Sequence, residues 1–119
     1  MKLDTYFGIP IDAELLGNYF KTLVNLFFKI LPIREAEDPT LETYMCSLRN
    51  ELLGCREVVV AIHNNAGFLS LISILQYLIE NPDCSVRDVK REVFKAISIC
   101  NRLAACYGEN TEVGDGRVE

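Results

Sequence analysis

Apolar residues recur along this chain at steps of three and four, which is the period of an amphipathic α-helix. The longest regular row lies between residues 39 and 63: Leu41, Met45, Leu48, Leu52, Cys55, Val59 and Ile62. A row that keeps this spacing without a gap packs lengthwise along a neighbouring helix. The pattern therefore predicts one continuous helix over 39–63, with the β-prone run Val58-Val59-Val60 inside it. We expect no strand anywhere in the chain.

Three further segments show the helical period with apolar faces of different width. Segment 12–31 has a central row with more apolar residues on both sides of it: Leu16, Phe20, Leu23, Phe27 and Ile30. Segment 66–80 is apolar nearly all round, which is typical of a helix covered on several faces or contacting another subunit. Segment 86–107 has a single apolar row: Val86, Val89, Val93, Ala96, Cys100, Leu103 and Tyr107.

Helix-capping and helix-breaking residues separate these segments. Asp12 and the pair Asp38-Pro39 are suited to begin helices, because a carboxylate accepts free N–H groups and proline needs no donor in the first turn. Ser85 and Asp88 resemble a capping box at the start of the fourth segment. The predicted ends and turns are Pro32, the run His63–Gly67 with its capping asparagines, the pair Asn81-Pro82, and Gly108.

These signals predict an all-α protein, an antiparallel four-helix bundle with helices at about 12–31, 39–63, 66–80 and 86–107. Short connections between consecutive helices favour the antiparallel arrangement. Residues 1–11 contain Gly8 and Pro10 and are expected to form an irregular lead-in. We expect a single helical domain over 1–108. An acidic, flexible tail is expected over 109–119, which has four acidic residues and one arginine.

Charge and hydropathy narrow the class of protein. A formal charge of −5 over 119 residues argues against a general phosphate-binding surface, which requires clustered Lys and Arg. The stretch 58–79 carries no Lys, Arg, Asp or Glu and is long enough to span a bilayer. His63, Asn64 and Asn65 interrupt it, so two buried helix segments joined by a turn are expected instead of a membrane segment. The first residues show no secretory signal.

The number and spacing of the five cysteines indicate the cellular compartment of the protein. Their number is odd and no C-x-x-C pair occurs, so a reducing cytoplasm is expected. With a single histidine, His63, we expect no metal site and no cofactor. Cys84 comes just before a predicted helix N-terminus, whose dipole is expected to lower the pKa of the thiol.

A row of charged residues follows one edge of the 39–63 helix at intervals of seven: Glu42, Arg49, Arg56 and His63. Arg56 and His63 match R-x6-H, which is similar to the R-x4-6-H motif of HEPN-type ribonucleases, also small helical bundles. The resemblance implies a metal-independent ribonuclease, in which the imidazole moves a proton and the guanidinium holds phosphate charge. Arg56 is followed by Glu57, where many members have Asn or another polar residue. Alternatively, these side chains rim the core and pair with acids on a neighbouring helix.

The fourth predicted helix carries a basic patch in its first turns: Arg87, Lys90, Arg91 and Lys95. Nucleic-acid binding through this patch is a second alternative function. It is not favoured, because the patch has no aromatic interleaving and no short recognition-helix pattern. A solvated face, or a site for the acidic tail of the same or a neighbouring chain, is the other interpretation.

The leading hypothesis is a protein–protein interaction or self-association module without catalytic activity. The 12–31 and 66–80 helices offer more apolar face than one four-helix core needs, and a homodimer or another protein partner would bury the surplus. The row expected at this interface lies on the third helix: Phe68, Ile72, Leu75 and Ile79. No motif specifies a reaction or the identity of the partner.

Overall fold

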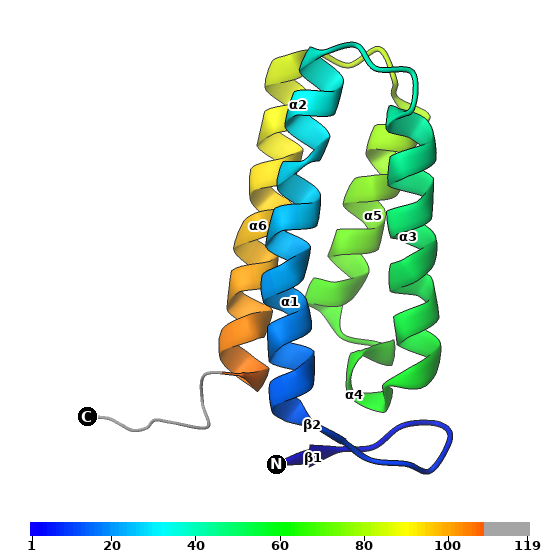
Figure 1. Cartoon of the computed structure of the whole chain (residues 1–119), viewed down its shortest axis with the longest axis vertical. Coiled ribbons are helices and arrows are strands. Elements are labelled where there is room, and N and C mark those ends of the chain that lie inside the picture. Colours follow the sequence, from blue (N-terminus) through cyan, green and yellow to red (C-terminus); the bar gives the residue numbers. More distant parts are fainter. Residues whose placement is uncertain (109–119) are drawn as a thin grey trace, which may run out of the picture.

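Four long helices run up and down in the computed structural model, which describes residues 1–108 (Figure 1). They are listed here in chain order with two short helices between them: α1 (Ala13–Phe28), α2 (Ile30–Glu35), α3 (Leu41–Val58), α4 (Val60–His63), α5 (Ala66–Glu80) and α6 (Val86–Tyr107). The predicted antiparallel four-helix bundle is confirmed. The tail predicted over 109–119 lies outside the described residues. Within the described part, no helix is both long and apolar enough to cross a membrane.

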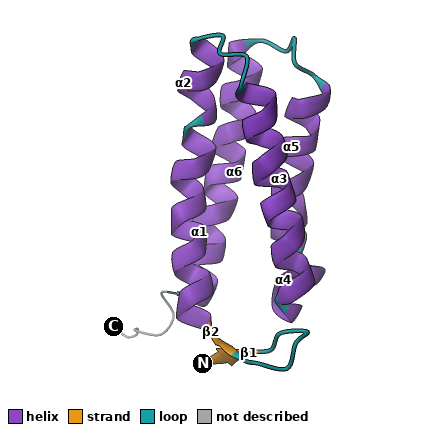
Figure 2. Cartoon of the chain, turned by 45° about the vertical axis from the view of Figure 1, so that its right-hand side comes forward, coloured by secondary structure: helices purple, strands orange, loops and turns teal. Residues whose placement is uncertain are grey.

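The helices form two pairs. α1 packs most extensively against α6, and α3 packs against α5, while α5 also contacts α6 (Figure 2). Long side chains connect α1 to α3 across the remaining side. Tyr44 Oη donates to the backbone oxygen of Leu26 at 2.6 Å. Tyr19 Oη donates to Glu51 Oε2, also at 2.6 Å.

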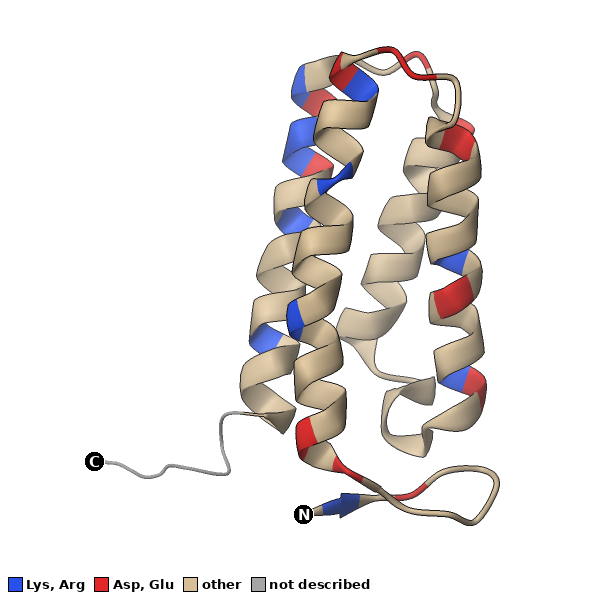
Figure 3. Ribbon diagram, in the orientation of Figure 1, with Lys and Arg blue, Asp and Glu red and all other residues tan. Residues whose placement is uncertain are grey.

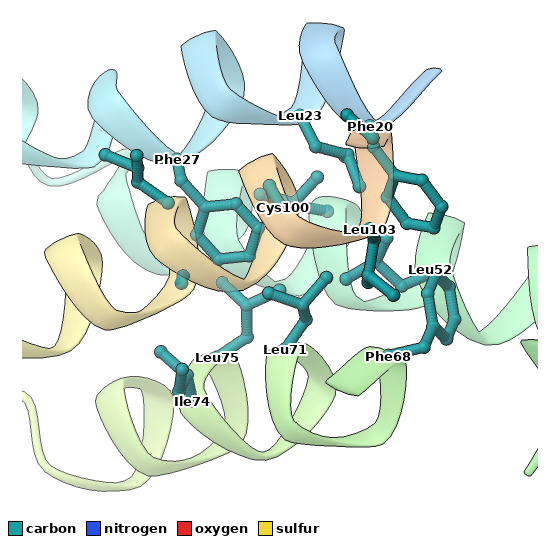
Figure 4. Close-up of a cluster of buried hydrophobic side chains, with 14 of the residues drawn as sticks. Phe20, Leu23, Phe27, Leu52, Phe68, Leu71, Ile74, Leu75, Cys100 and Leu103 are labelled. Atoms are coloured by element: carbon teal, nitrogen blue, oxygen red, sulfur yellow. The ribbon is translucent and has the colours of Figure 1, made fainter. Parts of the chain in front are cut away.

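The core consists largely of the apolar rows that the sequence pattern predicts. Side chains from α1, α3, α5 and α6 meet in one cluster around Phe20, Phe27 and Phe68, each with no exposed surface (Figure 4). The rings of Phe20 and Phe68 pack edge to face, with centroids 6.1 Å apart. Burying one such side chain stabilises the fold by about 1.5–3 kcal/mol. The predicted row of the second helix is likewise buried at Met45, Leu48, Leu52, Val59 and Ile62.

The first helix is interrupted earlier than Pro32. The prediction that this proline ends the helix is wrong, because α1 ends at Phe28 and α2 then includes Pro32. Proline has no N–H to donate to the oxygen of Phe28, and its ring crowds that carbonyl, so the break falls in the preceding turn. Pro32 itself lies in the first turn of α2, where no donor is needed.

The helix predicted over 39–63 is shorter and divided. It begins at Leu41, because the preceding chain forms a turn in which Asp38 Oδ1 accepts the backbone N–H of Thr40 at 2.9 Å. α3 ends at Val58, and Val59 is extended, with φ −101° and ψ 117°. α4 then resumes the helical path at Val60.

An N-terminal hairpin accounts for this division. Its strands β1 (Lys2–Leu3) and β2 (Ile11–Asp12) pair antiparallel, and Thr5 forms an isolated bridge with Val59. Two backbone hydrogen bonds flank the bridge: Tyr6 N–H to Val58 O at 2.9 Å, and Val60 N–H to Asp4 O at 3.1 Å. The predictions of an irregular lead-in and of a chain without strands are therefore wrong. A β-branched residue such as Val59 accepts the extended conformation readily.

Two of the predicted helix caps are confirmed. Asn65 Oδ1 accepts the N–H of Phe68 at 2.9 Å, and Ser85 Oγ accepts the N–H of Asp88 at 3.1 Å. Asp12 stands at the N-cap position of α1, but its side chain makes no capping hydrogen bond. Its carboxylate instead forms a salt bridge of 2.8 Å with Lys2 of the paired strand.

Candidate functional site

Arg56 and His63 lie on either side of the extended residue Val59. Arg56 Nε donates to the backbone oxygen of His63 at 2.8 Å. His63 Nδ1 lies 3.1 Å from the backbone oxygen of Arg56, and because a carbonyl oxygen can only accept, this nitrogen carries the proton. The two side chains therefore make reciprocal hydrogen bonds across the break between α3 and α4.

The hairpin covers one side of this pair. The ring of Tyr6 packs edge-on against the His63 imidazole, with centroids 5.5 Å apart and planes at 74°. Arg56 and His63 are both half-buried, and the hydrogen bonds described here join each side chain to backbone, not to the other side chain. These contacts support a structural role, in which the pair holds α3, α4 and the hairpin together.

The other members of the charged row on α3 contact different parts of the molecule. Arg49 Nη1 donates to Gln76 Oε1 of α5 at 2.9 Å, and Gln76 Nε2 donates to Glu80 Oε2 at 2.6 Å. Glu42 lines a cavity at the other end of α3. The row spaced at intervals of seven is therefore spread along the helix, and its members do not converge on one site.

Acidic neighbours neutralise half of the predicted basic patch. Arg91 pairs with Asp88 at 2.8 Å and with Glu92 at 3.2 Å. Lys95 pairs with Glu92 at 3.2 Å, and Glu92 is 7 % exposed. Within residues 1–108, Arg87 and Lys90 have no salt-bridge partner. Figure 3 shows basic and acidic residues interspersed on these turns of α6.

The row predicted at a subunit interface lies largely inside the molecule. Phe68 and Leu75 are fully buried in the chain's own core, so a partner cannot contact them while this core is intact. Ile72 and Ile79 are half-buried and pack against the same core. α5 is therefore apolar all round mainly because α3 and α6 cover it on two sides.

Several exposed apolar residues belong instead to the hairpin and to the α3–α4 break with which the hairpin pairs. This hairpin-end surface consists of five residues: Tyr6, Phe7, Ile9, Val58 and Val60. Phe7 is 73 % exposed and Ile9 is 72 % exposed, the highest values among the large apolar residues described. Residues 5–11 carry no charge, and Figure 3 shows this loop without any charged colour. The sequence signal was the placing of aromatic and aliphatic residues directly around Gly8 and Pro10.

A cavity of about 180 Å³ lies at the opposite end of the bundle. Four helices and two connecting loops line it, among them α2 with Arg34 and the 81–85 loop with Cys84. Arg34 Nη2 donates to the backbone oxygen of Cys84 at 3.1 Å. Burial, followed by the charge of Asp88, raises the pKa of the Cys84 thiol, so the predicted lowering by the helix dipole is wrong.

The described residues contain no group of three or more His, Cys, Asp or Glu placed to hold a metal ion. None of the five cysteines forms a disulfide. Comparisons with profiles of protein families, with curated proteins and with solved structures found no match. Function is therefore inferred from the two features that stand out in this bundle, the hairpin-end surface and the end cavity.

Proposed function

We propose that this chain is a non-catalytic interaction module that self-associates as a homodimer through its hairpin-end surface. The observation that carries the proposal is the exposure of Phe7 and Ile9, at 73 % and 72 %, at the tip of an ordered hairpin. Clusters of exposed apolar side chains of this kind mark interaction sites more often than single exposed residues do.

The tip of the hairpin is held in place before any partner binds. Thr5 Oγ1 donates to the backbone oxygen of Ile9 at 2.7 Å, and the N–H of Gly8 donates to the oxygen of Thr5 at 3.2 Å. Gly8 has φ 82°, which favours glycine, so the turn is built for this conformation. A preorganised tip lowers the entropic cost of association.

A second copy is the partner that this surface fits best. None of its five residues is charged, so two copies can bury these side chains while the exposed carboxylates beside them, Asp4 and Glu57, stay in water at the rim. A two-fold interface uses the same patch on both subunits, so a single apolar patch is sufficient to form it. The five free thiols fit a reducing compartment, so we place the dimer in the cytoplasm.

Solution mass tests this proposal directly. Light scattering coupled to size exclusion should show a dimer for the full chain, and the double variant Phe7→Ser, Ile9→Ser should be monomeric. Phe94→Ser is the matched control, because Phe94 is 50 % exposed but lies on α6, away from the hairpin. A full chain that stays monomeric at high concentration, or a dimer that survives the double substitution, would overturn the proposal.

A further inference from the structure

The end cavity has an apolar floor made of core side chains. Ile30, Met45, Leu78 and Val89 line it, and none of them is more than 4 % exposed. These residues come from α2, α3, α5 and α6, so the floor is fixed by the packing of the whole bundle. Apolar cavities of about 150 Å³ bind benzene in other proteins, and a volume of about 180 Å³ suits an apolar body of roughly six or seven carbons.

The mouth of this cavity is polar and mainly acidic. A second recess beside the cavity shares Arg34, Asp38, Leu41 and Pro82 with it, so the two adjoin. Four carboxylates and one guanidinium line the cavity and the adjoining recess taken together: Glu37, Asp38, Glu42, Asp83 and Arg34. A recess lined by one dominant sign of charge raises the local concentration of ligands of the opposite sign.

The single guanidinium keeps its charge and offsets one of the four carboxylates. Arg34 directs Nη2 to the oxygen of Cys84, which fixes the side chain against the 81–85 loop. Asp38 Oδ1 accepts both the N–H and the hydroxyl of Thr40, at 2.9 and 2.7 Å. These hydrogen bonds lower the pKa of the Asp38 carboxyl, so it remains charged at neutral pH.

We propose that the end cavity binds a small primary amine with an apolar body of about six or seven carbons. The apolar body fills the chamber above Met45 and Leu78, and the ammonium group lies at the mouth between Asp38 and Glu42. A carboxylate ligand of the same length would place its charge among four acids and opposite one arginine. A neutral alcohol would fill the chamber but gain nothing from the charge at the mouth.

Titration of the full chain with three ligands of equal length tests the proposal. Hexylamine, hexanol and hexanoate are added to isotope-labelled protein, and amide shifts of the cavity residues are followed by NMR. At about 20 mM salt we expect hexylamine to bind with a Kd on the order of 1 mM and about fivefold more tightly than hexanol. Raising salt to about 500 mM should remove most of that difference, because the mouth is exposed to solvent.

Two surface glutamates of α3 provide a matched pair of variants. Glu42→Gln removes one charge from the mouth and should weaken hexylamine binding about two- to fivefold. Glu57→Gln, at the other end of the same helix, should leave the affinity unchanged, and both glutamates are exposed, so neither variant disturbs the core. No shifts at the cavity with hexylamine would overturn the proposal, as would hexanol or hexanoate binding as tightly. An equal effect of the two variants would also overturn it.

Discussion

Gly17 of α1 lies in direct backbone contact with Gly108, the residue that ends α6. A Cβ atom added at Gly17 would lie 2.5 Å from both the Cα and the nitrogen of Gly108. The contact occurs where α1 begins and α6 ends. It therefore holds these two helices, which pack most extensively against each other, close together at the end of the bundle that carries the hairpin. Neither helix could approach the other as closely with any larger residue at position 17.

Gly17→Ala should therefore destabilise the protein. We expect the free energy of unfolding to fall by about 1–3 kcal/mol, because the added methyl meets backbone that cannot move aside as a side chain can. Gly54→Ala is the control, since an added Cβ there meets nothing within 4 Å. It should stabilise α3 by about 0.5–1 kcal/mol. Urea denaturation measures both, and equal effects of the two substitutions would contradict the contact.

Arg56 and His63 should contribute to stability and not to catalysis. Arg56→Ala and His63→Ala each remove a side-chain hydrogen bond to backbone across the break at Val59. We expect each to lower the free energy of unfolding by about 0.5–1.5 kcal/mol. Any RNA cleavage by the purified protein should be the same in both variants. Cleavage that the full chain performs and that both variants lose would instead support the ribonuclease alternative.

Alkaline pH should destabilise the protein through its buried thiol. Burial raises the pKa of the Cys100 thiol to about 12, whereas the pKa of a cysteine in an unfolded chain is about 8.5. The unfolded chain therefore releases this proton first, and the free energy of unfolding falls as the pH rises between these two values. The loss is complete only above the folded pKa.

Cysteine variants separate this effect from general alkaline unfolding. Cys100→Val should make the fall in stability above about pH 9 less steep, because the buried ionisable group is gone. Cys106→Ser changes an exposed position, so the fall in the free energy of unfolding with pH should be as steep as in the unsubstituted chain. Urea midpoints across this pH range measure the difference, and identical slopes in both variants would contradict the assignment.

Nucleic-acid binding by α6 should be weak and sensitive to salt. Arg91 and Lys95 are engaged by Asp88 and Glu92, so few positive charges are available to release counterions from phosphates. Fluorescence anisotropy with single-stranded RNA should show binding lost by about 150 mM salt, and Arg87→Ala with Lys90→Ala should abolish what remains. Binding that persists at that salt concentration would instead support nucleic-acid binding as a function of α6.

The apolar rows were predictable because they depend only on local spacing. A residue that recurs at steps of three and four must face one side of a helix, so the buried positions Leu16, Met45 and Cys100 follow directly from the sequence. The caps at Asn65 and Ser85 involve only residues three positions apart, so the sequence predicts them equally well.

The features that the sequence pattern missed depend on distant contacts. Val59 fits the helical row and is buried as predicted, yet it is extended because the hairpin, far away in the sequence, forms backbone hydrogen bonds with Val58 and Val60 on either side of it. Apolar width alone does not distinguish a helix covered by its own chain from one covered by a partner, so the pattern predicts Phe68 and Leu75 at an interface although the chain's own core buries both. The surface around Phe7 likewise depends on the pairing of the hairpin with the α3–α4 break, a contact between segments far apart in the sequence.

The bridge between Thr5 and Val59 also sets the order in which this molecule can assemble. The hairpin meets α3 only after more than fifty intervening residues have been arranged, and closing so long a loop carries an entropic cost that local helix formation does not. The helices should therefore form first and the hairpin should dock late. Its amides should also exchange with solvent sooner than those of the core helices. Association through the whole hairpin-end surface would then report on completed folding, because Val58 and Val60 join Phe7 and Ile9 only after the hairpin has docked.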